Sequence, residues 1–129
     1  MGVADLELVA ELTVPADAEM LTVCRTTLAG VGAGLALSDQ VLDDLKLVLS
    51  EVCAAAMERT GALDGTVGIE FRRSEGEIEV SVSDRGGAAH PGAGGLGFAL
   101  LRQQCSRLEV APSPRGPGRI VRFAQTLPA

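Results

Sequence analysis

Glu51 and Ala55 stand four residues apart in Leu45–Ala56, a segment whose apolar residues recur at helical spacing. This spacing places both positions on one face of the predicted helix. A carboxylate there can accept a proton or bind a cation, whereas an alanine side chain can coordinate nothing. The alternative for Glu51 is an exposed position in a helix, which glutamate favours. Its apolar neighbours favour a pocket.

A second candidate group is Asp84, which ends an alternating segment and lies two residues before Gly86. Alone, Asp-x-Gly after a strand is a common turn. Here it opens a stretch of 14 residues, 84–97, that contains six glycines and leads into a helical pattern from Gly97 to Cys105. Long irregular segments of this kind are usually functional or disordered.

The elements that must position these groups follow an α+β order. Alternation predicts strands over residues 6–14, 65–73, 77–83, 107–111 and 119–127. Helices are predicted over 15–28, beginning at Pro15 and Asp17, from the N-cap Ser38 to about Gly61, and over 97–105. This order predicts a two-layer sandwich, with the helices on one face of a mixed, mostly antiparallel sheet.

Composition narrows the class of function. The net charge is −6 and only 2% of the residues are aromatic, which argues against phosphate-backbone binding and base stacking, so no nucleic-acid partner is expected. Residues 1–84 carry 16 acids against 5 bases, and residues 85–129 carry 1 acid against 6 bases. The basic part either faces an anionic partner or neutralises the rest of the fold.

Cys24, Cys53 and Cys105 lie far apart in apolar helical patterns, which is typical of free, buried thiols. The one histidine, His90, lies in the glycine-rich stretch and is expected to be an exposed loop residue, so no metal site built from Cys and His is predicted. The acidic N-terminus has no long apolar run. We therefore expect neither a signal peptide nor a membrane span, and a cytoplasmic protein.

Three segments together resemble, in their order and spacing, the GHKL (histidine kinase-like) ATPase superfamily, in particular its anti-sigma-factor serine kinases. LKLVLSEVCAAA resembles the N-box, in which an acid that orients the attacking hydroxyl is followed four residues later by an asparagine that binds Mg²⁺. The resemblance implies that Glu51 is the catalytic acid. Ala55 stands in the place of the asparagine, and the chain contains no asparagine at all.

Two further segments resemble the nucleotide-binding boxes of that superfamily. EVSVSDRGG resembles the G1 box, which implies that Asp84 accepts a hydrogen bond from the adenine amino group and that Gly86 lets the backbone approach the base. GGLGFALLRQQ resembles the G2 box, which implies a lid end over the phosphates and an arginine near the phosphates or the partner surface. The residues concerned are Gly95, Leu96, Gly97 and Arg102.

The last predicted strand departs from this pattern. Members of the superfamily often have a threonine there that supports the adenine-binding aspartate, and Arg119 stands in its position. Arg59 or Arg119 could replace part of the charge of the missing metal ion. The simpler alternative, favoured by the sequence, is that both are solvated surface arginines.

The resemblance implies a single histidine kinase-like ATPase domain over residues 1–129 with the Bergerat fold. It also implies a homodimeric regulator that acts by partner switching and binds a sigma factor, an anti-sigma-factor antagonist or both. ATP or ADP is the implied ligand, but the missing asparagine argues for weak or altered nucleotide binding, against Mg²⁺, and for reduced or absent serine kinase activity, as in a pseudokinase. Two alternatives stay open: an active serine/threonine kinase that phosphorylates the antagonist, and a nucleotide-free interaction module.

Overall fold

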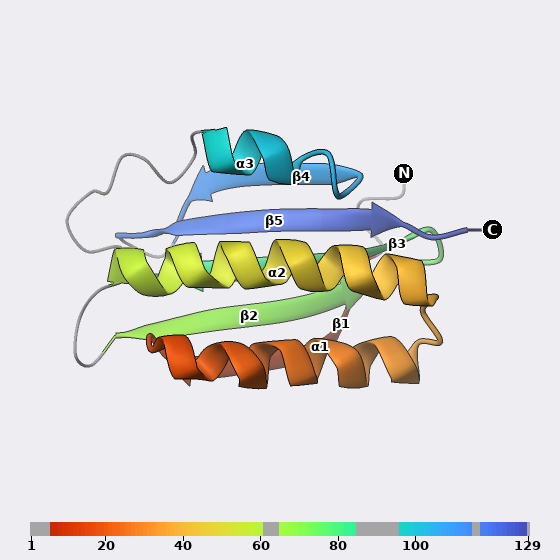
Figure 1. Cartoon of the computed structure of the whole chain (residues 1–129), viewed down its shortest axis with the longest axis horizontal. Coiled ribbons are helices and arrows are strands. Elements are labelled where there is room, and N and C mark those ends of the chain that lie inside the picture. The colour runs from red at the N-terminus through yellow and green to blue at the C-terminus, as the bar shows by residue number, and fades with distance from the viewer. Residues whose placement is uncertain (1–5, 61–64, 85–95, 115–116, 129) are drawn as a thin grey trace.

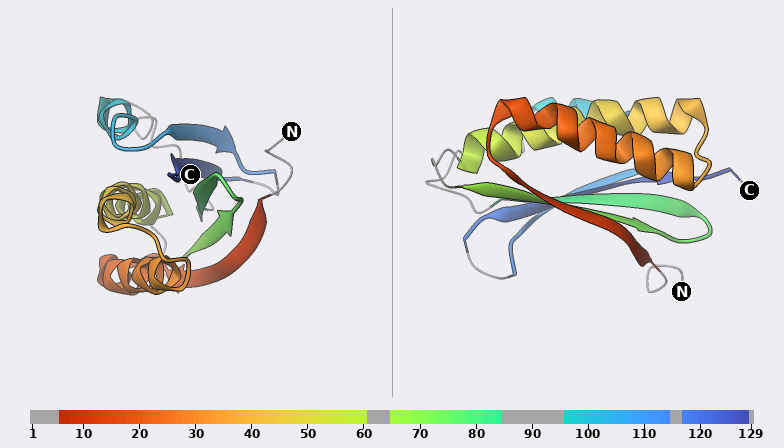
Figure 2. Two further views of the ribbon diagram at one scale, coloured as in Figure 1. Left: turned by 90° about the vertical axis from the view of Figure 1, so that its right-hand side faces the viewer. Right: turned by 90° about the horizontal axis from the view of Figure 1, so that it is seen from below.

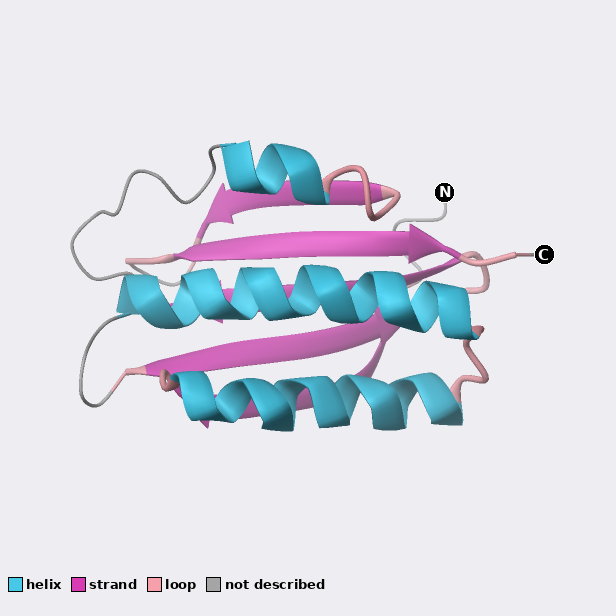
Figure 3. Ribbon diagram, in the orientation of Figure 1, coloured by secondary structure: helices cyan, strands magenta, loops and turns pink. Residues whose placement is uncertain are grey.

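The computed structural model describes residues 6–60, 65–84, 96–114 and 117–128. Figure 3 shows the helices and strands of these ranges. In chain order the elements are β1 (Glu7–Pro15), the 3-10 turn η2 (Ala18–Met20), α1 (Leu21–Gly34), α2 (Asp39–Thr60), β2 (Thr66–Arg73), β3 (Glu77–Asp84), α3 (Leu96–Leu101), β4 (Arg107–Pro112) and β5 (Arg119–Thr126).

The strands form one sheet in the order β1-β2-β3-β5-β4, so β5 is inserted between β3 and β4. Every neighbouring pair among the described strands is antiparallel, where the sequence predicts a mixed sheet. The helices all lie on one face of this sheet (Figure 2). The predicted two-layer α+β sandwich is confirmed.

The core fills the space between the helices and the sheet and is mainly aliphatic. Along β2, Val67, Ile69 and Phe71 are buried, while the residues between them face the open side of the sheet. The central helix, α2, lies between α1 and α3 (Figure 1). It buries one face through residues at helical spacing: Val41, Leu45, Val48, Leu49, Val52, Cys53, Ala56, Met57 and Thr60.

The first helix begins later than predicted, because Pro15 and Asp17 serve other elements. Pro15 is the last residue of β1, where it pairs with Thr66. Asp17 caps the 3-10 turn, and its Oδ1 accepts a hydrogen bond from the N–H of Glu19 (3.0 Å). A helix that starts at Pro15 is therefore a wrong prediction.

The same helix also ends later than predicted, at Gly34 instead of near Leu28. Packing of α1 against α2 outweighs the low helix propensity of its glycines. At Gly32 an added Cβ atom would lie 2.8 Å from Cδ1 of Leu42 on α2. The glycine thus permits a close approach of the two helices.

A Schellman motif closes α1. The N–H of Leu37 donates to the carbonyl of Gly32 (2.9 Å), and the N–H of Ala36 donates to that of Ala33 (3.2 Å). Ala36 occupies the position at which glycine is usual, with a φ of 56°. A left-handed residue other than glycine stores strain here.

The remaining helix boundaries agree with the sequence in part. Ser38 caps α2 as predicted, since its Oγ accepts a hydrogen bond from the N–H of Val41 (3.2 Å). Gly61, the predicted stop of α2, lies outside the described residues. The third helix ends at Leu101, because the chain then tightens into a turn in which the N–H of Gln103 donates to the carbonyl of Leu100 (3.1 Å).

The cysteines lie where apolar side chains are expected. Cys24 and Cys53 are buried between α1, α2 and the sheet, Cys105 is half-buried, and all three are free thiols. Among the described helices, none has the length and apolar character needed to cross a membrane.

Candidate functional site

Asp84 ends β3 on the face of the sheet that the helices cover, since it continues the buried alternation of Val80 and Val82. Its neighbour across the ladder is Arg119 of β5. The backbone N–H of Arg119 donates to Oδ1 of Asp84 (3.3 Å), and Nε of Arg119 lies 3.5 Å from Oδ2. Nε of Arg59, from α2, donates to the same Oδ2 (3.1 Å). We refer to these three residues as the Arg59–Asp84–Arg119 cluster.

The two arginines are therefore not solvated surface residues, and that prediction is wrong. Arg119 is only 7% exposed, and the side chain of Arg59 is 15% exposed. The guanidinium carbon of Arg119 lies 5.2 Å from the centre of the Phe98 ring on α3, within range of a cation–π contact. The strand register and the packing of α3 hold Arg119 inside the fold.

The cluster holds two positive charges against one negative charge. Desolvation lowers the pKa of Arg119, and the nearby charge of Arg59 lowers it further, while Asp84 acts in the opposite direction. Within the described residues, Nε and Nη2 of Arg119 have no hydrogen-bond acceptor. The burial of Arg119 is thus offset only in part by its contact with Asp84.

Glu51, Ala55 and Arg59 follow one another at intervals of four residues along one flank of α2. Glu51 is exposed and Ala55 is half-buried. At one end of this flank Arg59 reaches Asp84. The spacing predicted for Glu51 and position 55 is confirmed, and the same flank leads to the cluster.

Contacts at the other end of α2 show which way this flank faces. Asp44, two turns before Glu51, accepts a hydrogen bond from Nε2 of Gln125 at the end of β5 (3.3 Å). On the opposite flank, Ser50 accepts a hydrogen bond from Nη1 of Arg25 on α1 (3.2 Å). The Glu51 flank therefore faces β5 and α3, which is the side on which Asp84 lies.

The other predicted site residues are only partly described. Leu96 and Gly97 form the first turn of α3, and Gly86, Gly95 and His90 lie outside the described residues. Arg102 is exposed after α3, and its Nε donates to the carbonyl of Leu108 on β4 (3.4 Å). Their roles toward a nucleotide stay predictions.

The residues present do not fit a nucleotide and Mg²⁺ in the way that the resemblance implies. The carboxylate that should accept a hydrogen bond from adenine is buried and already faces three nitrogen atoms of Arg59 and Arg119. Ala55 supplies no ligand for a metal ion between Glu51 and the cluster. Among the described residues, Arg59 and Arg119 thus take up the acceptor that the resemblance assigns to adenine.

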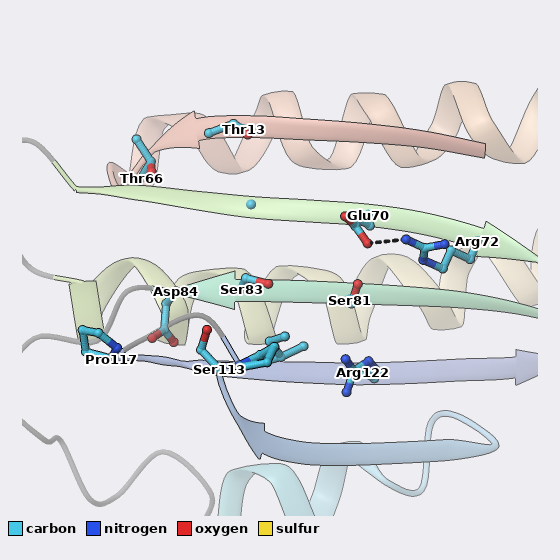
Figure 4. Close-up of a pocket in the computed structure, with 13 residues that line it drawn as sticks. Thr13, Thr66, Glu70, Arg72, Ser81, Ser83, Asp84, Ser113, Pro117 and Arg122 are labelled. Carbon is cyan, nitrogen blue, oxygen red and sulfur yellow. Dashed lines mark hydrogen bonds and ion pairs between the residues drawn. The ribbon is translucent and has the colours of Figure 1, made fainter. Parts of the chain in front are cut away.

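A separate hollow of about 740 Å³ lies on the open face of the sheet (Figure 4). Its floor is polar, with Ser81 and Ser83 of β3 beside Arg122 of β5, and Arg72 donates to Glu70 at its side (2.9 Å). Among the predicted site residues that are described, Asp84 alone lines this hollow. It lies across the sheet from the flank of α2 that carries Glu51.

Comparison with known proteins agrees with this architecture. The family model of the histidine kinase-like ATPase domain matches residues 14–124. The chain is 28% identical over 123 residues to the serine-protein kinase RsbW of Bacillus pumilus, covering 78% of this chain and 76% of that protein. It is 36% identical over 78 residues to RsbW of Bacillus subtilis, covering 59% of this chain and 49% of that protein.

A similar match is found with the serine-protein kinase RsbW of Halalkalibacterium halodurans, at 32% identity over 76 residues. It covers 59% of this chain and 47% of that protein. In this match and in that with the Bacillus subtilis protein, the chain spans about half the length of its relative.

Proposed function

Because the chain belongs to the histidine kinase-like ATPase domain family, we propose that it is an anti-sigma-factor-type regulatory protein that acts by partner switching. In this proposal its ATP binding is weak or altered and its serine kinase activity is reduced or absent. Similarity to serine-protein kinases named RsbW supports the class of regulator. The single observation that carries the loss of activity is the Asp84 carboxylate, which two arginines already engage.

The proposal includes the partners that the resemblance implies, a sigma factor, an anti-sigma-factor antagonist or both. A homodimer, a cytoplasmic location and one domain over residues 1–129 belong to it as well. Binding of a protein partner needs the scaffold and its exposed side chains but no bound nucleotide, so it can persist where catalysis is lost.

Phosphoryl transfer depends mainly on positioning and on neutralising charge. Glu51 is exposed on the flank that faces the cluster, so it can still accept a proton from a hydroxyl group that approaches this side. Ala55 holds no counter-charge next to it. We therefore expect a transfer rate that is lower by orders of magnitude than an asparagine at this position would permit.

The test is a calorimetric titration of the full chain with ATP and with ADP, each with and without Mg²⁺. We expect weak binding or none, and little change on adding Mg²⁺. Micromolar binding that tightens with Mg²⁺ would contradict the proposal. Binding of purified sigma factors and antagonists in the absence of nucleotide tests the partner-switching half.

The Arg59–Asp84–Arg119 cluster also favours the nucleotide-free interaction module as a second candidate function. The two differ in one respect, because a module of this kind binds its partner with the same affinity whether or not nucleotide is present. An active kinase would instead transfer phosphate to the antagonist, and Glu51→Ala would abolish that transfer.

A further inference from the structure

The Arg119 guanidinium lies between an acid and an aromatic ring. Asp84 borders it on the side of β3, with Nε 3.5 Å from Oδ2, and the Phe98 ring of α3 lies 5.2 Å from its central carbon. A guanidinium is flat, carries N–H donors along its edge and stacks on aromatic faces. An aminopurine is larger, but it is also flat, can stack on an aromatic face and presents N–H donors from its amino group.

We propose that Arg119 is an internal occupant of the base-binding pocket and stands in for a planar nitrogen base between Asp84 and Phe98. This inference rests on the proposed function and gives a cause for the altered nucleotide binding. Arg119 closes the pocket to adenine by using the acceptor and the ring face that adenine needs. It is the residue that determines whether the pocket admits a base.

The surroundings of the Arg119 guanidinium satisfy its hydrogen-bond donors only in part. Nε and Nη2 of Arg119, the two donors on one edge of the guanidinium, have no hydrogen-bond acceptor within the described residues. The charge of Arg59 opposes a second cation at the same carboxylate. The contact between Arg119 and Asp84 is therefore set by the strand register. The hydrogen-bond donors of the guanidinium are not all used there.

Removal of Arg119 leaves equal numbers of positive and negative charges in the cluster. Arg59 keeps its hydrogen bond to Oδ2 of Asp84 (3.1 Å), so one positive charge still compensates one negative charge. A carboxylate has about four acceptor positions in total, and the hydrogen bonds from Nε of Arg59 and from the backbone N–H of Arg119 use only two of them. The ligand that this space suits is an aminopurine that stacks on Phe98 and donates to Asp84.

Recognition of this kind does not involve the phosphates or a metal ion. The probes are therefore adenosine and ADP, both without Mg²⁺, tested against the full chain by thermal unfolding and by calorimetry. The variants are Arg119→Ala and Arg119→Thr, of which the second retains a hydroxyl that can donate to Asp84. Arg122→Ala is the matched control, because Arg122 lies on the same strand but faces the open side of the sheet.

We expect millimolar adenosine or ADP to raise the unfolding temperature of both Arg119 variants by about 3–5 °C. The natural chain and Arg122→Ala should shift by less than about 1 °C under the same conditions. Guanosine, which presents a carbonyl where adenosine presents its amino group, should be less effective on the Arg119 variants.

Folded Arg119 variants that show no gain over the natural chain would overturn the inference. If both shorter variants fail to fold, Arg119→Lys decides the matter, because it keeps the charge for Asp84 but removes the flat donor edge. A smaller gain is then expected, and no gain overturns the inference. Tight binding by the natural chain would contradict both the inference and the proposed function, whereas variants that show no gain, beside a natural chain that does not bind, overturn the inference alone; the two failures are therefore distinguishable.

Discussion

Arg119 and Asp84 are joined twice across the β3–β5 ladder, by the backbone N–H of Arg119 to Oδ1 at 3.3 Å and by an ion pair of Nε with Oδ2 at 3.5 Å. The carboxylate therefore compensates a buried charge and also accepts a hydrogen bond from the first residue of β5. Because Arg59 binds the same group, Asp84 is the one anion that two cations of the cluster share. Removal of Asp84 should therefore change the stability of the domain as well as the binding of any ligand at this site.

We expect Asp84→Ala to lower the free energy of unfolding by about 3–5 kcal/mol, because it removes the carboxylate that compensates the buried Arg119 guanidinium and that Arg59 also binds. Urea unfolding followed by circular dichroism measures this loss. Glu70→Ala is the control: it breaks a pair in which the glutamate is 42% exposed. That control should cost less than about 1 kcal/mol.

Arg119→Met complements this experiment. It removes one of two like charges and retains the Arg59–Asp84 pair, so we expect a change of at most about 1 kcal/mol in either direction. An equal loss in Asp84→Ala and Arg119→Met would contradict the view that the cluster carries an excess of positive charge.

The buried thiols should make the domain less stable in alkali. A hydrogen bond to Cys24, together with burial, raises the pKa of Cys53 far above its ordinary value of 9.0. Above about pH 9 the unfolded chain loses a proton that the folded chain keeps, so the free energy of unfolding should fall by about 1.4 kcal/mol per pH unit. The window is clear of tyrosine, because the chain has none.

The same hydrogen bond lowers the pKa of Cys24 below 9.0. Its contribution to stability therefore grows as the pH rises toward the unfolded pKa of about 9 and adds no slope once the thiol is ionised in both states. Unfolding in urea at pH 8, 9 and 10 should show a flatter profile for the double variant Cys24→Ala, Cys53→Ala. Cys105→Ala should remove only a part of the slope, because burial raises the pKa of this half-buried thiol as well; a double variant as steep as the natural chain would refute the explanation.

Ala36→Gly should stabilise the domain. Ala36 has a φ of 56° at the end of α1, a conformation that glycine adopts without a clash of Cβ. We expect a gain of about 0.5–1 kcal/mol in the free energy of unfolding. Ala33→Gly, within the same helix and exposed, should lose about 0.5–1 kcal/mol, and a loss in both variants would show that α1 does not end in a Schellman motif.

Arg107 connects three carboxylates on the open face of the sheet. Its guanidinium lies 2.6 Å from Glu77 and 3.1 Å from Glu79 on β3, and 3.0 Å from Glu109 on β4. Arg107→Ala leaves these acids to repel one another, and because Arg107 is one-third exposed we expect a loss of only about 1–2 kcal/mol at low salt. Adding salt should recover part of it by screening.

The variant Arg72→Ala provides the comparison for Arg107, since it removes a single pair with Glu70. Its loss should be below about 1 kcal/mol and nearly independent of salt. A deficit of Arg107→Ala that stays constant between low and high salt would argue against repulsion as its cause.

Both ends of every described strand could be predicted from the sequence to within one residue, as β2 and β5 illustrate. Alternation is local, and burial on one face of a sheet makes it visible. The bounds of α1 could not be predicted, because pairing of Pro15 with Thr66 and the close approach of Gly32 to Leu42 are tertiary contacts.

The candidate site was predictable in part. The helical spacing of Glu51 and Ala55 and the strand before Asp84 follow from local pattern. The environment of Asp84 does not, because Arg59 lies 25 residues away and Arg119 lies 35 residues away in the sequence. The only signal of Arg119 in the sequence is that it stands in phase with Val121 and Phe123, the apolar positions of the alternation, in the position of the family's threonine.

The insertion of β5 between β3 and β4 has a consequence for how the protein is made. As the chain leaves the ribosome, β3 emerges with one edge unpaired and waits until residues 119–126 follow. During this interval the Asp84 carboxylate has neither the backbone N–H nor the guanidinium of Arg119 as a neighbour, and the unpaired backbone N–H and C=O groups of one β3 edge are open to other nascent chains. Synthesis of β5 thus completes the Arg59–Asp84–Arg119 cluster in the same step that joins β3 to β4.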